Sequence, residues 1–374
     1  MKGGLHMEQS KRTALYDTHK KYNGNIVDFA GFELPLYYES ILEEHNAVRN
    51  NAGMFDVSHM GEVTVKGEEA ENYIQNLVTN DISVITDNGV MYTLMCYEDG
   101  GVVDDLLVYK YNTTDYLLVI NASNIEKDYN WMVEQKGSFD VDLENISDDV
   151  AEVALQGPKA QEILQKLTDT DLQTITFFRF NENVLVNNNK CIVSRTGYTG
   201  EDGFEIYTSL DNIVNIWEAI MEAGKDEGLK PAGLGCRDTL RFEVALPLYG
   251  NEIDKDITPL EASLGYFIKL DTDFIGKDVL VKQKEQGLSR KLVGIELLGK
   301  GIARHGYDIL SPDGDKIGVI TTGYQSPSVG KTVALGLIDI DYTKMGTDVS
   351  VKIRKKQVPA KVVSKKFYKK NYSK

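Results

Sequence analysis

Two adjacent carboxylates stand inside an apolar segment, VVDDLLVYKY, and are the first candidates for chemistry. Side chains alternate between the two faces of an extended strand, so Asp105 shares a face with Tyr109 while Asp104 points the other way. Aspartate is disfavoured in strand interiors, which favours a functional carboxylate, and a carboxylate beside an aromatic ring suits a flat, polar heterocycle. We therefore predict that Asp105 is the catalytic residue. The alternative is that both aspartates only cap the turn-rich EDGG segment before them.

A glycine-rich segment, SRTGYTGEDGFEIY, has Gly197, Gly200 and Gly203 at three-residue intervals, which is typical of a loop that approaches a ligand closely. It is not a phosphate loop, because it lacks a GK[ST] ending and its acids would repel phosphate. Glu205 opens the next strand, where its carboxylate could accept paired hydrogen bonds from an amino-pyrimidine edge. A plain hairpin with exposed acids is the alternative.

Arg237 and Arg241 are four residues apart in PAGLGCRDTLRFE and would share a helix face. Their like charges cost about a few tenths of a kcal/mol there, so we expect an anion nearby. A substrate carboxylate gripped by a guanidinium group would serve, and so would internal acids such as Asp238 and Glu243.

Composition and missing motifs exclude several classes of protein. Five histidines without metal-ligand spacing, and no HExxH, GxSxG or GxGxxG motif, disfavour a metal site, a serine hydrolase and a nucleotide cofactor. A net charge of -16 disfavours nucleic-acid binding. The basic cluster Lys365, Lys366, Lys369 and Lys370 is either a solvated tail or a contact for an anionic partner or substrate. Three isolated cysteines and no long apolar segment predict a cytoplasmic protein with no membrane span.

The spacing of apolar residues predicts the elements that position these groups. It indicates a helix over 35–50, an antiparallel meander from VMYTLMCY to YLLVIN, a helix-rich stretch over 254–286, and a small all-β domain after about residue 288, as a barrel or a sandwich. One strand-turn-helix unit recurs after ninety residues, although chance matching is the alternative. Its matching positions are Gly67, Ala70, Tyr73, Ile74 and Leu77, then Gly157, Ala160, Ile163, Leu164 and Leu167.

Eight motifs together resemble the aminomethyltransferase family, the T-proteins of the glycine cleavage system. The resemblance runs from about Thr13 to the tail, and its motifs are DFAGFELPLYY, GMFDVSHMGE, GGVVDDLLVYK, NASNIEKD, QGPKAQ, SRTGYTGEDGFE, PAGLGCRDTLR and LYGNEID. It implies an α+β fold with three domains round a central cavity: two related lobes of antiparallel sheet plus helices, and a C-terminal all-β, barrel-like domain.

The predicted boundaries make the first lobe discontinuous. This folate-binding lobe would comprise residues 7–58 and 145–250, and residues 59–144 would form a second lobe that carries the GGVVDD strand. Residues 251–287 would connect the lobes to the C-terminal β-domain, residues 288–374.

The resemblance also implies an activity: transfer of the methylene carbon of an S-aminomethyl-dihydrolipoyl arm, carried on the lipoylated H-protein, to tetrahydrofolate. Ammonia and 5,10-methylenetetrahydrofolate would be the products. The alternatives are a folate-dependent demethylase of a small methylated substrate and a noncatalytic folate-binding protein.

Roles within the family carry over to matching positions of this chain. Asp105 would lie beside the reacting folate nitrogens, Glu205 would hold the pterin ring, and Arg237 would belong to the folate site. The remaining folate-pocket positions would be Tyr92, Tyr109, Asn121, Tyr198 and Tyr372, with Arg304 at the entrance for the lipoyl arm. The tail, KKFYKKNYSK, departs from the family pattern, because relatives commonly have a proline before its Phe.

Overall fold

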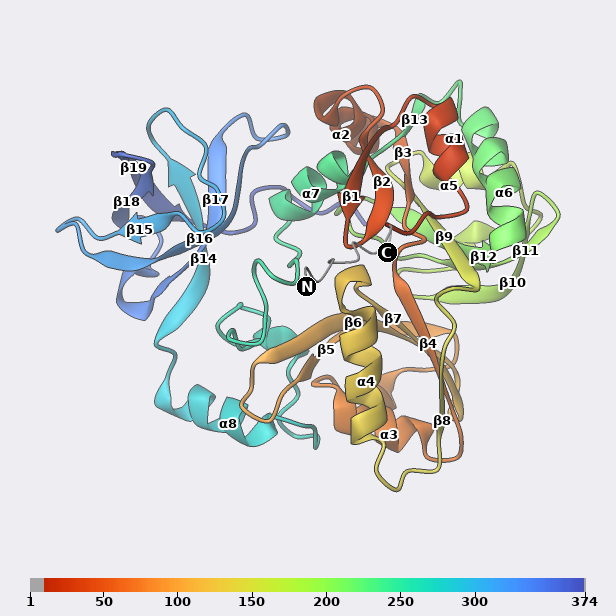
Figure 1. The fold of residues 1–374 in the computed structure, drawn as a ribbon, viewed down its shortest axis with the longest axis horizontal. Coiled ribbons are helices and arrows are strands. Elements are labelled where there is room, and N and C mark those ends of the chain that lie inside the picture. The colour runs from red at the N-terminus through yellow and green to blue at the C-terminus, as the bar shows by residue number, and fades with distance from the viewer. Residues whose placement is uncertain (1–9, 373–374) are drawn as a thin grey trace, which may run out of the picture.

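The protein is described by a computed structural model that covers residues 10–372. Figure 1 shows two sheet-and-helix bodies on one side and a β-barrel on the other, arranged around a central region. The predicted α+β fold class with a C-terminal barrel is confirmed. The predicted lobe that begins at residue 7 and the predicted domain that ends at residue 374 each extend beyond the described residues. None of the helices within residues 10–372 is long and apolar enough to cross a membrane.

The first body is a six-stranded sheet with helices on its outer face (Figure 1). Its strands in spatial order are β10 (Phe180–Val186), β11 (Asn189–Ser194), β12 (Gly203–Ser209), β9 (Val150–Gln156), β3 (Ala52–Asp56) and β13 (Leu229–Pro231). Helices α5 (Ala160–Gln165) and α6 (Leu210–Ala223) bury their apolar stripes against it, with Trp217 of α6 fully enclosed in the same core as Val153 and Leu155 of β9. The other side chains of β9 therefore point to the opposite, inner face.

The second body is a five-stranded antiparallel sheet that contains the predicted meander. Its strands in spatial order are β5 (Gly89–Cys96), β6 (Val102–Asn112), β7 (Asp115–Ile120), β4 (Gly61–Lys66) and β8 (Asp142–Asn145). Helices α3 (Ala70–Leu77) and α4 (Ile125–Gln135) cover its outer face, where Val63 and Val65 of β4 pack in the same core as Ile74 of α3.

The predicted internal repeat is confirmed by the two sheets, which use equivalent strands in the same order. Gly67 and Gly157 both have a left-handed backbone, with φ of 141° and 134°, and a Cβ on either would collide with backbone atoms. Gln75 and Gln165 both close the following turn, accepting a backbone hydrogen bond from Ile82 in one half and Leu172 in the other. A ninety-residue offset therefore relates the two halves atom by atom in these turns.

The two halves meet at equivalent residues. Gly89 pairs antiparallel with Arg179, and two hydrogen bonds flank the pair, from Val90 N to Phe178 O and from Phe180 N to Asn88 O, at 2.9 and 3.0 Å. A local two-fold axis consequently passes between Gly89 and Arg179. The inner faces of the sheets meet across an apolar layer formed by Val90, Tyr109, Leu117, Val119, Phe180 and Tyr207.

The C-terminal domain is a closed six-stranded barrel rather than a sandwich. Its strands in spatial order are β14 (Arg290–Leu297), β17 (Thr332–Asp339), β16 (Lys316–Gln325), β15 (Asp308–Leu310), β18 (Asp348–Ile353) and β19 (Lys356–Val363). Helix α7 (Leu234–Glu243) lies between the six-stranded sheet and the barrel (Figure 1).

Two predicted helical segments are shorter than expected. Residues 32–37 pair instead with β1 (Asn25–Phe29) as β2 (Phe32–Tyr37), and the helix α2 (Ile41–Asn50) begins only where Ser40 caps the backbone N–H of Glu43. The stretch over 254–286 contains only a single 3₁₀ turn (Gly265–Phe267) and the helix α8 (Lys277–Gln286), and otherwise consists of turns packed beneath the barrel. The short helix α1 (Tyr16–Lys21) precedes β1.

Candidate active site

Asp105 lies on the inner face of β6 and is 9% exposed. Tyr92 Oη donates to its Oδ2 at 2.9 Å, and Asn121 Nδ2 donates to its Oδ1 at 2.8 Å. Tyr92 comes from the adjacent strand β5, and Asn121 follows β7 on the other side of β6. Three neighbouring strands thus hold one carboxylate in a fixed orientation.

Asp104 points to the other face, as the strand alternation predicts, and is fully buried. It accepts hydrogen bonds from Asn121 N, Asn121 Nδ2 and Asn124 Nδ2, at 3.1, 2.9 and 2.9 Å. The two carboxylates are not independent, because the Asn121 amide contacts both. Neither caps the preceding turn: Asp99 does so, accepting from Gly101 N, and both aspartates lie inside β6.

Burial is the largest influence on Asp105 and raises its pKa to about 7, with a further rise from the negative charge of Asp104. The hydrogen bonds from Tyr92 and Asn121 oppose this rise in pKa because they favour the ionised form. Asp105 therefore changes its charge near neutral pH, the range in which a side chain can both hold and accept a proton efficiently.

Glu205 stands on the inner face of β12 and is almost completely buried. The hydroxyl of Thr196 donates to its Oε2. Burial raises the pKa of Glu205, and the Thr196 hydrogen bond and the positive charge of Arg237 pull the pKa back down. One face of this carboxylate is therefore supported by the protein, and a guanidinium group lies near it.

The two arginines of α7 behave differently. Arg241 is fully buried and is neutralised by Asp238 and Glu252, with nitrogen-to-oxygen distances of 2.7 and 2.6 Å. Glu243 pairs instead with Arg49, at 2.9 Å. Arg237 is only partly buried and forms no ion pair with any residue between 10 and 372; its guanidinium carbon lies 4.6 Å from the centre of the Tyr198 ring. Acidic side chains of the protein therefore neutralise the charge of Arg241, which was one of the two alternatives. Arg237 remains available to an anion.

Tyr198 connects the two ends of this site. Its hydroxyl donates to the carbonyl of Pro247, and its ring lies under Arg237. Charges on Asp105 and Arg237 both act on its hydroxyl, and Tyr92 is in turn influenced by Tyr198. The structure therefore brings together five of the predicted residues from three strands, one helix and one loop, with Asn121 beside them: Tyr92 (β5), Asp105 (β6), Glu205 (β12), Arg237 (α7) and Tyr198 (the loop before β12).

The glycines of the GYTGEDG loop serve packing within the chain. A Cβ on Gly197 would meet the Gln156 side chain at 2.0 Å, and one on Gly200 would meet Val244 at 2.5 Å. The acids of the loop are not exposed in a plain hairpin: Glu201 pairs with Arg49 at 2.9 Å, and Asp202 pairs with Arg195 at 2.5 Å. Close approach thus occurs, but the partners are β9 and the end of α7.

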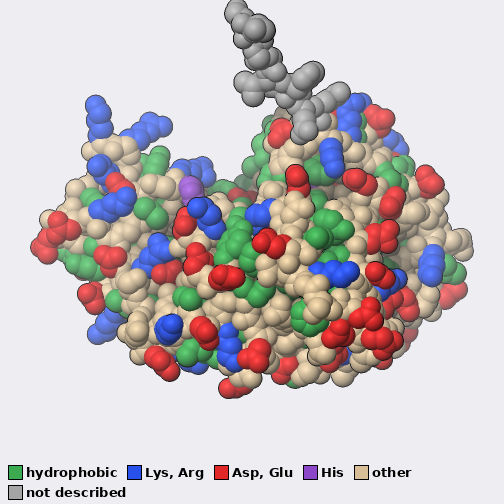
Figure 2. Space-filling model, turned by 60° about the horizontal axis from the view of Figure 1, so that its bottom comes forward, with side chains coloured by type: hydrophobic (Ala, Val, Ile, Leu, Met, Phe, Trp, Pro, Cys, Tyr) green, Lys and Arg blue, Asp and Glu red, His purple; other side chains and the backbone are tan. Residues whose placement is uncertain are grey.

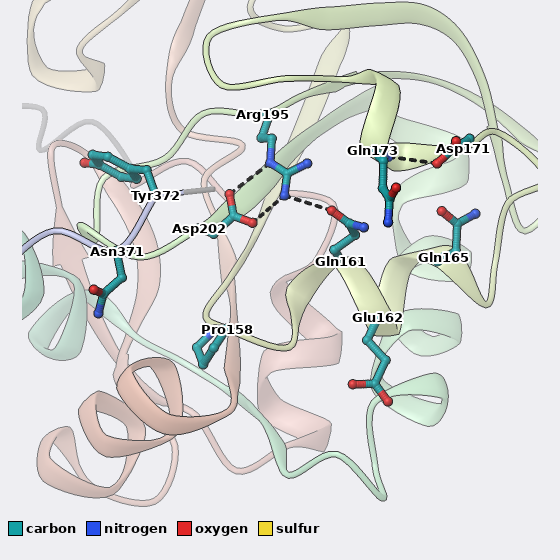
Figure 3. A pocket seen from close by; sticks show the side chains of 10 residues that line it. All are labelled: Pro158, Gln161, Glu162, Gln165, Asp171, Gln173, Arg195, Asp202, Asn371 and Tyr372. Atoms are coloured by element: carbon teal, nitrogen blue, oxygen red, sulfur yellow. Dashed lines mark hydrogen bonds and ion pairs between the residues drawn. The ribbon is translucent and has the colours of Figure 1, made fainter. Parts of the chain in front are cut away.

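Two further predicted residues, Tyr372 and Arg304, make contacts of a different kind. Tyr372 stacks on Phe177, with ring centres 4.4 Å apart, and helps to line a cavity of about 680 Å³ beside α5. Figure 3 shows that the guanidinium group in this cavity, Arg195, is already bound by Asp202 and Gln161. Arg304 is exposed on the barrel, 5.5 Å from the centre of the Tyr324 ring. Figure 2 shows the surface hollowed between the barrel and the rest of the molecule, with acidic side chains scattered over this face.

The sequence did not identify three buried residues of this region that carry an acidic or hydroxyl group. Glu62, Glu152 and Thr196 are all buried on the inner faces of the two sheets or at their ends. Glu62 and Glu152 are ninety residues apart, so the offset of the internal repeat was the signal that would have linked them. Thr196 carried no signal, because the sequence does not show which hydroxyl reaches a carboxylate.

Comparison with known proteins gives the family. Residues 15–272 match the GCVT N-terminal domain, and residues 290–369 match the glycine cleavage T-protein C-terminal barrel domain. Aminomethyltransferase from Caldanaerobacter subterraneus subsp. tengcongensis is 60% identical over 375 residues, covering all of both chains. The enzyme of that name from Thermoanaerobacter pseudethanolicus is 59% identical, covering 98% of this chain and 100% of its own.

A solved structure agrees with these sequence matches. The crystal structure of glycine cleavage system aminomethyltransferase T from Bartonella henselae superposes with a TM-score of 0.91 and 29% identity, covering 98% of this chain and 100% of that one. The fold and site thus define a one-carbon transferase. The chain belongs to the aminomethyltransferase family of the glycine cleavage system, as the motifs predicted.

Ionisation of Asp105 should cost stability. Its pKa in the folded protein lies above its ordinary value, so the stability that the protonated form provides is present at low pH and is lost as the pH rises through about 7. Asp105→Asn keeps a neutral group at every pH. We expect the melting temperature of this variant, relative to the unmodified protein, to be higher at about pH 8.5 than at about pH 5.5. An equal difference at both pH values would show that Asp105 has an ordinary pKa.

Proposed function

We propose that this protein transfers the methylene carbon of an S-aminomethyl-dihydrolipoyl arm on the H-protein to tetrahydrofolate, releasing ammonia and giving 5,10-methylenetetrahydrofolate. The observation that carries the proposal is the buried Asp105, fixed by Tyr92 and Asn121, with a pKa of about 7. Membership of the aminomethyltransferase family supports the same reaction.

The carbon that moves is bonded to both sulfur and nitrogen, so the nitrogen lone pair can expel the sulfur without a covalent nucleophile on the protein. Placement and electrostatics then remain for the protein to supply. In its ionised form Asp105 stabilises the positive charge that develops on the attacking folate nitrogen, and it accepts the proton from that nitrogen. Tyr92 and Asn121 keep the carboxylate aimed, because each donates to a different oxygen.

The donors and acceptors around Asp105 fit a folate. A pterin is flat and carries an amino-pyrimidine edge, to which the Glu205 carboxylate can offer two acceptor oxygens. Arg237 has guanidinium donors to spare for an anionic or carbonyl group, and Tyr92 and Tyr198 supply aromatic surface nearby. Tyr109 is fully buried, so it reaches the site through hydrogen bonds rather than by direct contact.

We extend the proposal to the H-protein as partner and to a cytoplasmic location. Arg304, which is exposed on the barrel near the Tyr324 ring, is a suitable contact for the lipoyl arm or its carrier. All three cysteines are buried free thiols, which suits a reducing compartment. The division into lobes 7–58 plus 145–250 and 59–144, a connecting segment 251–287 and a barrel domain 288–374 remains a prediction, as does the place of Tyr372 in the folate site.

Asp105→Asn should lose about 10²–10³ in turnover, by analogy with removal of one preorganised electrostatic contact. The amide keeps the size of the side chain but cannot neutralise positive charge or accept the proton. The assay supplies tetrahydrofolate and aminomethylated H-protein and follows 5,10-methylenetetrahydrofolate. Turnover of the unmodified enzyme should rise through about pH 7, and that rise should vanish in the variant. If the unmodified protein forms no product, the proposed reaction is wrong, and methyl transfer from a small donor would identify a demethylase instead.

Asp104→Asn is the matched control on the neighbouring residue. Asp104 accepts three hydrogen bonds from donors, so an amide –NH₂ would face at least one of them and cost about 1–3 kcal/mol of stability. Turnover of the folded fraction should fall less than in Asp105→Asn. A larger loss of turnover in Asp104→Asn would show that the wrong member of the pair was chosen.

Glu205→Ala and Arg237→Ala should each weaken tetrahydrofolate binding by roughly ten- to a hundredfold, the usual range for a lost hydrogen bond to a charged group. Equilibrium titration at fixed pH measures the dissociation constant, and thermal melts confirm folding. Lys230→Ala, which removes a surface cation paired with Glu39, is the control and should bind folate normally. Unchanged affinity in both site variants would remove these residues from the folate pocket.

A further inference from the structure

Two buried glutamates occupy equivalent positions of the internal repeat and have no assigned role. Glu62 on β4 and Glu152 on β9 are 1% and 2% exposed, and they lie ninety residues apart. Their strand neighbours Val63 and Val153 point to the helix-covered cores, so both glutamates point into the layer between the sheets. The two carboxyl groups are close enough for the charge of Glu62 to act on Glu152.

These carboxyl groups lack the partners that an ionised form would need. Among residues 10–372, neither oxygen of the Glu62 side chain has a hydrogen-bond partner, nor does Oε2 of Glu152. Neither residue forms an ion pair with a described lysine or arginine. An isolated carboxylate buried in this way costs far more than a neutral acid, and two neighbouring carboxylates cannot both ionise cheaply. Burial accordingly raises the pKa of each well above its ordinary value.

A continuous row of hydroxyl groups connects Glu152 to Glu205. Tyr207 stands directly opposite Glu152 on β12, close enough that a hydrogen bond from its hydroxyl would lower the pKa of Glu152, although burial outweighs this effect. The Tyr207 and Tyr109 hydroxyls are 2.9 Å apart, Tyr109 donates to Ser194 at 3.2 Å, and Ser194 lies 2.8 Å from the Thr196 hydroxyl. Thr196 then donates to Oε2 of Glu205.

The hydrogen-bond direction along this row is fixed at the Glu205 end, because Thr196 donates to Glu205. A hydroxyl has one proton to donate, so if Tyr109 donates to Ser194, the hydroxyl of Tyr207 must donate to Tyr109. The Tyr207 oxygen can then only accept a hydrogen bond from Glu152. Glu152 can donate one only if its carboxyl group is protonated. A neutral Glu152 would complete a row in which every member donates towards Glu205.

We propose that Glu152, held as a neutral acid beside neutral Glu62, heads the hydroxyl row from Tyr207 to Thr196 and is a positioning residue that keeps Glu205 ionised and oriented for the pterin edge. The proposal rests on the assignment of Glu205 to the folate site. No bond is made or broken: each hydroxyl keeps its own proton and polarises the next. Glu62 is the equivalent residue of the other half but stands outside the row.

The groups that face this row come from several elements. They are Glu62 from β4, Tyr109 from β6, Glu152 from β9, Glu205 and Tyr207 from β12, and Arg237 from α7, with His59 also under the influence of Arg237. Burial and Arg237 lower the pKa of His59 to about 4, so that His59 stays neutral between pH 6 and 8. Asp105 does titrate in that range, and it does so in every variant compared below.

The first test needs no folate. Infrared spectra of the full chain at about pH 9, where Asp105 is ionised, should contain carbonyl bands of buried protonated carboxyl groups that shift in D₂O. Glu152→Gln should remove one such band, and Glu62→Gln should remove another. If Glu152→Gln removes a carboxylate band instead, Glu152 is ionised and the proposal is overturned, whatever the protein does with folate.

The second test measures the tetrahydrofolate dissociation constant between about pH 6 and 8. Glu152→Leu removes the donor at the head of the row, so the pKa of Glu205 should rise and affinity should fall as the pH falls, by up to about tenfold per pH unit relative to the unmodified protein. Glu152→Gln retains an N–H donor and should restore the original slope. Glu62→Leu, the equivalent change outside the row, should leave the slope unaltered.

A merely structural role gives a different result. A folded Glu152→Leu that keeps the original slope would show that the carboxyl group does not act on Glu205, and would refute the positioning role. If Glu205→Ala leaves folate affinity unchanged, the folate assignment has failed, and the infrared result still decides the state of Glu152. The two failures are therefore distinguishable.

Discussion

The cost of removing carboxyl groups from water is the constraint on which this site depends. Two sheets meet face to face across an apolar layer, and the acids at its edge and inside it can ionise only where donors have been supplied. Asp105 has two donors and Glu205 has one, together with the nearby charge of Arg237. Glu62 has none. The supply of donors thus separates chemically similar groups into acids whose ionised form is supported and acids whose ionised form is not.

The internal repeat explains how this arrangement arises and shows where the two halves differ. Equivalent residues Lys110 and Arg195 hold equivalent helix residues, Glu71 at 2.5 Å and Gln161 at 2.8 Å. The two aspartates have counterparts inside the shorter strand β11: Asp104 and Asp105 pair with Met95 and Leu94, and the equivalents of these two, Leu185 and Val184, pair with Lys190 and Cys191. A symmetric scaffold therefore fixes the backbone, and different side chains at the same positions give one half its two carboxyl groups.

Much of this organisation could be predicted from local patterns. Period-two alternation placed Asp105 and Asp104 on opposite faces of β6, because that rule depends only on an extended backbone. It could not show that Asn121 would join the two carboxyl groups, since that contact depends on how β7 ends. The same limit applies to Pro35. The local pattern predicts that a helix begins there, but Pro35 lies in β2, which pairs with β1. The motif resemblance predicted further pocket residues, such as Tyr198 and Tyr372, that no periodicity could identify.

The glycine loop shows a second kind of limit. Three glycines at regular spacing require close approach, and close approach is what they give, but the sequence cannot name the partner. Here the partners are Gln156 and Val244 rather than a ligand. Likewise, the repulsion between Arg237 and Arg241 predicted an anion correctly for Arg241, whose partner Glu252 lies eleven residues on and outside the helix.

Burial and the charge of Asp104 should raise the pKa of Asp105 to about 7 in the free enzyme, and carbon-13 NMR of the labelled aspartate carboxyl groups measures that pKa. The resonance lost in Asp105→Asn identifies Asp105, and its chemical shift is followed across pH without folate. We expect a titration midpoint of about 7 that moves down when Asp104 is changed to Asn, because one of the two causes of the raised pKa is then removed. A midpoint near the ordinary aspartate value of about 3.9 would contradict it.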